Sequence, residues 1–101
     1  ASGAEFSFQS FAPGTETGFL HSHKTHEELY FFLSGQGEFQ VDSKVFPISE
    51  GSVVRVSPAG MRSVRNNGTQ PLIMLCIQYK AGTFTAGDST DGIISKEEVK
   101  W

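Results

Sequence analysis

The chain is poor in the residue types that mark secreted and nucleic-acid-binding proteins. Its 101 residues include a single cysteine, Cys76, so no disulfide can form within the chain. A lone thiol suits a reducing compartment, and we expect a cytoplasmic protein in which Cys76 is a small buried residue. Only 8 residues are Lys or Arg, against 11 Asp or Glu. Such a chain lacks the clustered cations of a nucleic-acid-binding face.

Long hydrophobic runs and the common phosphate and nucleophile motifs are also missing. The longest apolar run surrounds "PLIMLCI", far short of the ~18 residues that a membrane helix needs. The opening "ASGAEFSFQS" has no basic region followed by an apolar block, as a signal peptide would have. No G-x-x-x-x-G-K-[ST], G-x-G-x-x-G or G-x-S-x-G motif occurs. We therefore expect no membrane partner, no nucleic-acid partner and no serine-hydrolase triad.

Turn signals and short β-rich runs are what the sequence does contain. Gly, Pro, Asn and Asp clusters recur every 8 to 12 residues or so, which is typical of an all-β sandwich or barrel. A chain of this length fits one domain, residues 1–101, with a core over about 5–80 and a tail over 81–101. The expected strands are 5–11, 18–23, 27–33, 37–42, 44–48, 52–56, 62–66 and 71–79. In the tail, Ser95 and Glu98 are spaced like a capping box, so 95–101 forms either a short helix or a frayed end.

All three histidines lie in one stretch, "HSHKTHEELYFFLSG", residues 21–35. Side chains alternate along a strand, so His21 and His23 share a face. After a turn, Glu28, Tyr30 and Phe32 share one face of the next strand. Two imidazoles and a carboxylate form a ligand set that Zn, Fe, Mn and Ni ions accept, with positions left open. The alternative is a solvated histidine pair on a strand edge.

The opposite face of that strand is also apolar, with Leu29, Phe31 and Leu33 beside Glu27. The interior of so small a domain can cover only one face of the strand, so a second subunit could cover the other. We expect a homodimer, with "EFSFQSF" as a candidate for pairing across subunits.

This stretch resembles the first motif of the cupin family, whose core is H-x-H, four residues, Glu, six residues and Gly. His21, His23, Glu28 and Gly35 match that core at the right spacing. Gly18 lies near the glycine that the family places before the first histidine, though not at the usual distance. The resemblance implies an all-β double-stranded β-helix, or jelly-roll barrel. It also implies a divalent metal held inside by His21, His23 and Glu28.

The second cupin motif, G-x5-P-x-G-x2-H-x3-N, is matched only at its ends. Gly51 and Asn66 stand at the first and last positions, whereas Ser57 replaces the proline, Ala59 the glycine and Arg62 the histidine. The family's fourth metal ligand is therefore absent, because no histidine follows His26 in the chain.

Three outcomes follow from the missing histidine. A metal could be held by His21, His23 and Glu28 alone, with water or substrate completing its shell. His26, otherwise a residue at the rim, could swing in as a fourth ligand. Alternatively, Arg62 pairs with Glu28 and the interior binds a ligand without metal. Arginine recognises carboxylate or phosphate rather than metals, so Arg62 is our candidate for binding an anionic substrate.

Three functions fit these residues, and the sequence leaves open whether the protein is an enzyme. The first is a metal-dependent enzyme of dioxygenase or isomerase type acting on a small anionic metabolite. Tyr30, on the face of Glu28, would contact substrate there as a general acid, unless it only packs in the core. The second is a metal-free module or sensor that binds a sugar or small acid without turnover. The third is a structural, dimerising β module.

Overall fold

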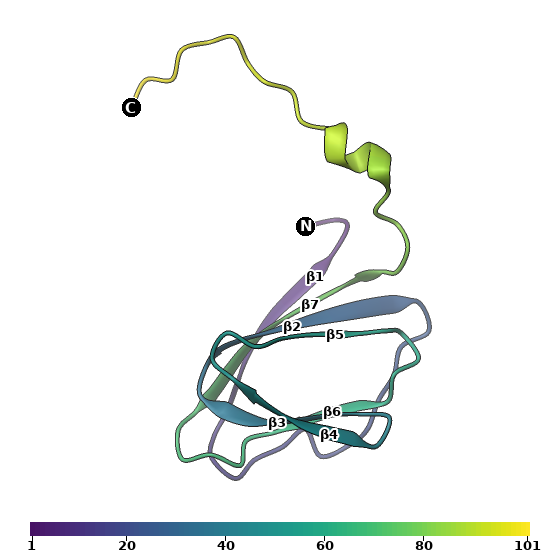
Figure 1. The fold of residues 1–101 in the computed structure, drawn as a ribbon, viewed down its shortest axis with the longest axis vertical. Coiled ribbons are helices and arrows are strands. Elements are labelled where there is room, and N and C mark those ends of the chain that lie inside the picture. The colour runs from purple at the N-terminus through teal and green to yellow at the C-terminus, as the bar shows by residue number, and fades with distance from the viewer.

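The computed structural model describes residues 1–101, and nearly all of its regular structure is β-strand (Figure 1). Seven strands run between residues 5 and 80, followed by one short 3-10 helix in the tail. The elements are β1 (Glu5–Phe11), β2 (His26–Ser34), β3 (Gln36–Val41), β4 (Lys44–Ser49), β5 (Val53–Val56), β6 (Arg62–Arg65), β7 (Leu72–Lys80) and η1 (Ala86–Thr90). No helix in the structure has the length and hydropathy needed to span a bilayer.

The strands form two facing antiparallel sheets, as a jelly roll requires. The four-stranded sheet has the order β1-β7-β2-β5, and the three-stranded sheet has the order β4-β3-β6. The two sheets are not joined into one continuous ladder, so the predicted barrel is open along its seams. The all-β fold that the sequence predicts is confirmed, but the closed barrel is not.

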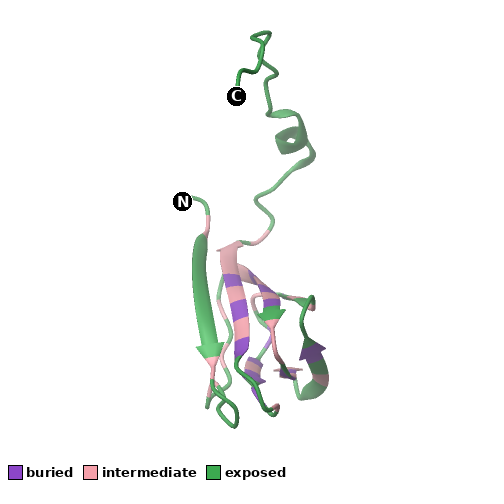
Figure 2. Cartoon of the chain, turned by 90° about the vertical axis from the view of Figure 1, so that its left-hand side faces the viewer, coloured by how far each residue is buried: buried purple, intermediate pink, exposed green.

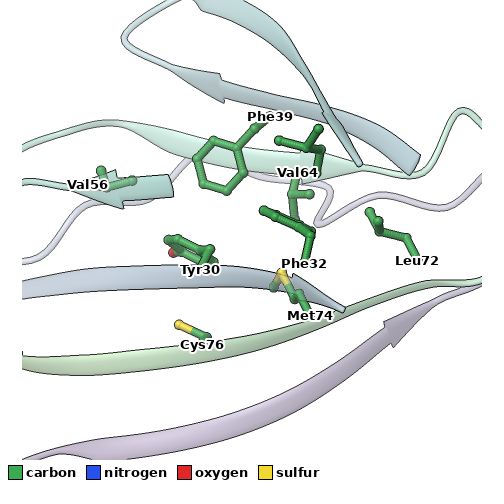
Figure 3. Packing of buried hydrophobic residues seen from close by; sticks show 9 residues of the cluster. Tyr30, Phe32, Phe39, Val56, Val64, Leu72, Met74 and Cys76 are labelled. Carbon is green, nitrogen blue, oxygen red and sulfur yellow. The ribbon is translucent and has the colours of Figure 1, made fainter. Parts of the chain in front are cut away.

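The core lies between the two sheets, as the alternation of apolar residues predicts. Tyr30, Phe32, Met74 and Cys76 project from the four-stranded sheet toward Phe39 of the facing sheet (Figure 3). The ring centroids of Tyr30 and Phe39 are 4.9 Å apart and tilted by 64°, an edge-to-face packing that aromatic rings favour. The assignment of Glu28, Tyr30 and Phe32 to the inner face of β2 is thereby confirmed.

One expected strand, 18–23, is not a strand in the structure. Loop 12–25 instead runs beside β6 and makes two isolated bridges, Glu16 with Arg65 and His21 with Arg62. Gly18 separates the bridges with a φ of +85°, a left-handed conformation that interrupts the extended backbone. The prediction of a strand here was wrong because this glycine turns the chain.

Two residues of the cupin motifs have structural roles that explain their identity. Gly35 joins β2 to β3 with a φ of +86°, and a Cβ there would lie 2.3 Å from the carbonyl oxygen of Pro71. Asn66 is buried, and its Nδ2 donates to the carbonyls of Phe11 (2.9 Å) and Gln70 (2.8 Å). Both residues hold connections at the same end of the fold.

The tail leaves the sheets after β7 and is exposed over nearly all its length (Figure 2). The short helix expected at 95–101 is absent, so of the two alternatives the irregular tail is the one observed. The helix that does form, η1, begins after a capping box of Thr85 and Asp88. A T-x-x-D spacing in the sequence is the local signal for such a start, but this helix was not predicted.

Candidate metal centre

Loop 12–25 and β2 bring the histidine pair and the glutamate together at the interior. The backbones of His21 and Arg62 exchange hydrogen bonds of 3.2 and 2.9 Å, and the amide of His23 donates to the carbonyl of Pro58 at 2.8 Å. These contacts fix both histidines beside the β5–β6 connection. Glu28 faces them from the inner side of β2.

The three predicted metal ligands converge to within the span of one ion. One donor atom from each of His21, His23 and Glu28 lies within 4.8 Å of the others. His23 Nε2 is 3.0 Å and His21 Nε2 is 3.8 Å from Glu28 Oε1. Two imidazole nitrogens, His21 Nδ1 and His23 Nε2, are buried and have no hydrogen-bond partner. Buried polar atoms are normally paired, so these nitrogens point to something that completes the site.

Glu28 is the centre of a buried polar network. Its Oε1 accepts hydrogen bonds from Tyr30 Oη (2.7 Å) and Arg62 Nη1 (2.6 Å), and its Oε2 accepts one from Cys76 Sγ (3.0 Å). The sequence did not indicate Cys76 for this network, because an isolated cysteine in an apolar strand looks like any core residue. The register of β7 against β2, which pairs Cys76 with Tyr30, was the missing information.

Opposing effects set the protonation of these groups. Burial acts to raise the pKa of Glu28, but the hydrogen bonds from Cys76 and Tyr30 and the charges of His23 and Arg62 outweigh it and leave the pKa below its ordinary value. Burial raises the pKa of the Cys76 thiol to about 12, and the Glu28 carboxylate adds to the shift. Burial also lowers the pKa of His21, against the attraction of Glu28. Glu28 is therefore ionised at neutral pH, Cys76 keeps its proton and His21 is neutral.

Arg62 is 1% exposed and contacts protein groups through all three of its nitrogens. Besides Glu28, Nε donates to the carbonyl of Gly60 (3.0 Å), and Nη2 donates to the carbonyls of Ser57 (2.7 Å) and Pro58 (3.0 Å). A guanidinium has five N–H groups, so these contacts leave little capacity for a ligand. The expected ion pair of Arg62 with Glu28 is present, whereas its contact with a substrate stays a prediction.

The other predicted residues take different places. Tyr30 is 4% exposed and packs in the core, with its hydroxyl directed at Glu28; its contact with substrate also stays a prediction. His26 is not in the three-residue cluster. Its Nδ1 is 2.9 Å from Gln78 Oε1. Glu27 lies on the outside, where it accepts hydrogen bonds from Tyr79 and Arg55.

A small cavity of about 70 Å³ adjoins the cluster. His21, Glu28, Tyr30, Arg62 and Cys76 contribute to its wall, together with apolar residues of both sheets. This volume accommodates a few water molecules or one compact ligand.

Comparison with known proteins identifies the family. Residues 7–78 match the Cupin domain family. A cupin protein from Bacteroides fragilis has a TM-score of 0.89 and 36% identity, with 94% of this chain and 80% of that chain covered. This coverage exceeds residues 1–80 and therefore extends into the tail.

A curated sequence and a solved structure from Thermotoga maritima are also similar. An oxalate-binding protein is 32% identical over 72 residues, which cover 71% of this chain and 59% of that protein. The structure of a predicted oxalate decarboxylase has a TM-score of 0.74 and 30% identity, with 78% of this chain and 69% of that chain covered. The chain spans 59% of this oxalate-binding protein and 57% of a second curated relative, an uncharacterized protein from Methanocaldococcus jannaschii that is 31% identical over 71 residues.

The match to the family covers most of the chain, and the first-motif residues converge in space as that family's motif requires. The chain therefore belongs to the cupin family.

Proposed function

We propose that this cupin domain binds a divalent transition metal through His21, His23 and Glu28 and holds a compact anionic ligand beside it. The observation that carries the proposal is the buried, unpartnered Nε2 of His23 beside the ionised carboxylate of Glu28, with Nε2 of His21 3.8 Å from the same carboxylate oxygen. His23 Nε2 lies 3.0 Å from Glu28 Oε1 yet makes no hydrogen bond there. An ion bound between the two side chains would give His23 Nε2 the partner that it lacks.

The donor set fits such an ion. Imidazole and carboxylate suit Zn, Fe, Mn and Ni, and three protein ligands leave positions open for a ligand. The lowered pKa of His21 keeps its ring neutral, which is the form that ligates metals. Arg62 replaces the fourth ligand of the family and places a positive charge against Glu28. That charge weakens the affinity for a cation without removing any of the three donors.

The size and charge of the site favour a compact anion. The adjoining cavity is about 70 Å³, and both Arg62 and a bound metal would attract negative charge. The Thermotoga maritima matches, both of which are named for oxalate, suggest a small dicarboxylate as the class of ligand. When bound, the metal would supply Lewis-acid polarisation of ligand oxygens. The chain itself would hold the histidines through the Arg62 and Pro58 backbones, keep Glu28 ionised and exclude bulk water with the core around Tyr30. Turnover of the ligand by dioxygenase- or isomerase-type chemistry is the enzymatic form of this proposal.

A second candidate function is metal-free binding of a small acid or sugar, as a module or sensor. The contact between Arg62 and Glu28 favours it, because a guanidinium already neutralises the carboxylate that a metal would need. In this case His21 and His23 would donate hydrogen bonds to the ligand.

Metal analysis of untagged protein separates the two candidates. The protein is reloaded with Zn, Fe, Mn or Ni, dialysed and measured by inductively coupled plasma mass spectrometry. We expect about one ion per chain in the wild type, loss of the ion in a His21→Ala/His23→Ala variant, and full retention in His26→Ala, the matched histidine outside the cluster. Wild-type protein that takes up none of the four metals would contradict the metal centre. Calorimetric titration of the metal-free protein with oxalate would then test the second candidate.

A further inference from the structure

The tail, residues 81–101, carries apolar side chains that nothing in its own chain covers. Phe84 is 78% exposed, Ile93 96% and Ile94 95%, and Val99 and Trp101 are also exposed. Figures 1 and 2 show the tail running beyond the sheets, without returning to either of them. Exposing five large apolar side chains of a 21-residue segment to water is unfavourable in free energy, and burial would remove this cost.

The outer face of the four-stranded sheet also carries exposed apolar side chains. Cross-strand partners project to the same side, and the register builds two apolar rows on this face. The first row is Phe6, Ile77 and Leu29, and it ends at the charged Arg55 on β5. The second row is Phe8, Leu75, Phe31 and Val53. Phe8 is 73% exposed and Val53 is 56% exposed, and β1 is exposed almost throughout (Figure 2).

The total surface shows how much cover is missing. The chain exposes 7317 Å², whereas a folded monomer of 11.0 kDa exposes about 5,600 Å². The excess of about 1,700 Å² includes the surface of the extended tail itself, and it is roughly twice the 800 Å² that each partner buries in an interface of standard size. The radius of gyration, 17.0 Å, likewise exceeds the value of about 13 Å for a compact chain of this length.

We propose that the tail of one copy packs across the outer face of the four-stranded sheet of a second copy. In a twofold dimer each chain supplies one tail and one face, so a single arrangement covers both apolar surfaces twice. This proposal is independent of the metal centre, which lies on the inner side of the same sheet.

The structure directs the tail to a second copy rather than back to its own sheet. Thr83 Oγ1 donates to the carbonyl of Lys80, and the capping box of Thr85 and Asp88 starts η1. These local bonds hold residues 80–91 on a course that leads away from the sheets (Figure 1). The similarity to the Bacteroides fragilis cupin extends into this segment, which indicates a shared structural feature.

Trp101 is the only tryptophan of the chain, and it provides a direct test. Sedimentation and tryptophan emission are measured on the full chain over a dilution series. We expect a dimer whose emission is blue-shifted, and a red shift that accompanies dissociation to the monomer. Val53→Asp on the outer face and Ile94→Asp in the tail should each raise the dimer's dissociation constant at least about 10-fold. A 10-fold change corresponds to a loss of about 1.4 kcal/mol for each apolar group that is no longer buried.

Matched controls locate the contact. Val45 lies on β4 in the other sheet and is 51% exposed, so Val45→Asp adds the same charge at a similar valine and should leave the dimer intact. In the tail, Ser95→Asp adds the same charge next to Ile94 and should also leave the dimer intact. Mixing Val53→Asp with Ile94→Asp protein should restore part of the dimer, because the mixed pair retains one intact tail and face.

Three results would overturn the proposal. The first is a monomer at every concentration. The second is a monomer with blue-shifted emission, which would place the tail on its own sheet. The third is a dimer whose Trp101 emission stays red and that neither Val53→Asp nor Ile94→Asp weakens.

Discussion

The guanidinium of Arg62 lies 2.6 Å from the carboxylate of Glu28, and the two side chains are only 1% and 5% exposed. Arg62 belongs to β6 of the three-stranded sheet and Glu28 to β2 of the four-stranded sheet. The ion pair therefore joins the two sheets across their interior, at the position where the family's motif has a histidine. Removing one partner of a buried pair leaves an uncompensated charge, which is more harmful than removing both.

We predict that Arg62→Met destabilises the fold by about 3–5 kcal/mol, because it leaves the Glu28 carboxylate buried without its counterion. The double variant Arg62→Met/Glu28→Gln should recover a substantial part of this loss, since neither charge then remains. Denaturation in urea, followed by far-UV circular dichroism, measures both values. Equal losses in the single and double variants would show that the carboxylate is not what Arg62 stabilises.

Arg62→His restores the fourth ligand position of the second cupin motif. The substitution adds a donor and removes a positive charge beside Glu28. We predict that zinc affinity rises by more than about 10-fold, the size of change that even an outer-shell contact produces. Competition with a chromophoric chelator measures the affinity, and Arg65→His, at an exposed position on the same strand, is the control. An unchanged affinity in Arg62→His would argue against a metal at this position.

The Glu28 network makes stability depend on acid pH in the metal-free protein. The pKa of Glu28 lies below its ordinary value of 4.5 in the folded state, so the folded state binds the proton less readily than the unfolded state. Its contribution is complete above about pH 4.5 and is lost as pH falls through the lowered folded-state pKa. We predict a fall in Tm over that acid range in the wild type and a flatter curve in Glu28→Gln. Differential scanning calorimetry between neutral and acid pH measures the two curves; parallel curves would contradict the prediction.

Alanine substitutions at Gly35 and Gly51 distinguish the cost of steric crowding from the cost of backbone strain. Their φ values are +86° and +88°, but only at Gly35 would a Cβ meet the backbone, at 2.3 Å from the carbonyl oxygen of Pro71. Gly51→Ala should cost about 1–2 kcal/mol, the strain of a left-handed alanine. Gly35→Ala should cost at least about 2 kcal/mol more, because the connection to β7 must also move. Guanidinium denaturation of the two variants gives the comparison, and equal costs would show that the close approach relaxes freely.

Most of the β structure was predictable from the sequence because its signals are local. Glycine and proline clusters delimit short runs of β-branched and aromatic residues, and the period-two pattern of 27–33 assigned both faces of β2 correctly. The predictions failed at residues 18–23 and at η1 for equally local reasons, a glycine that turns the chain and a T-x-x-D cap in an otherwise polar tail. In the candidate site, the motif spacing correctly predicted that His21, His23 and Glu28 lie together.

By itself, then, the sequence determined the all-β fold, the three side chains that converge and the absence of the histidine of the second motif. Only the tertiary structure decided what stands in that histidine's place and where the exposed apolar residues lie. Arg62 and Cys76 reach Glu28 from β6 and β7, strands far from it in the sequence. The direction of each side chain depends on strand register and on how the two sheets face each other. Those relations are set by packing of the whole chain, and no local pattern of residues records them.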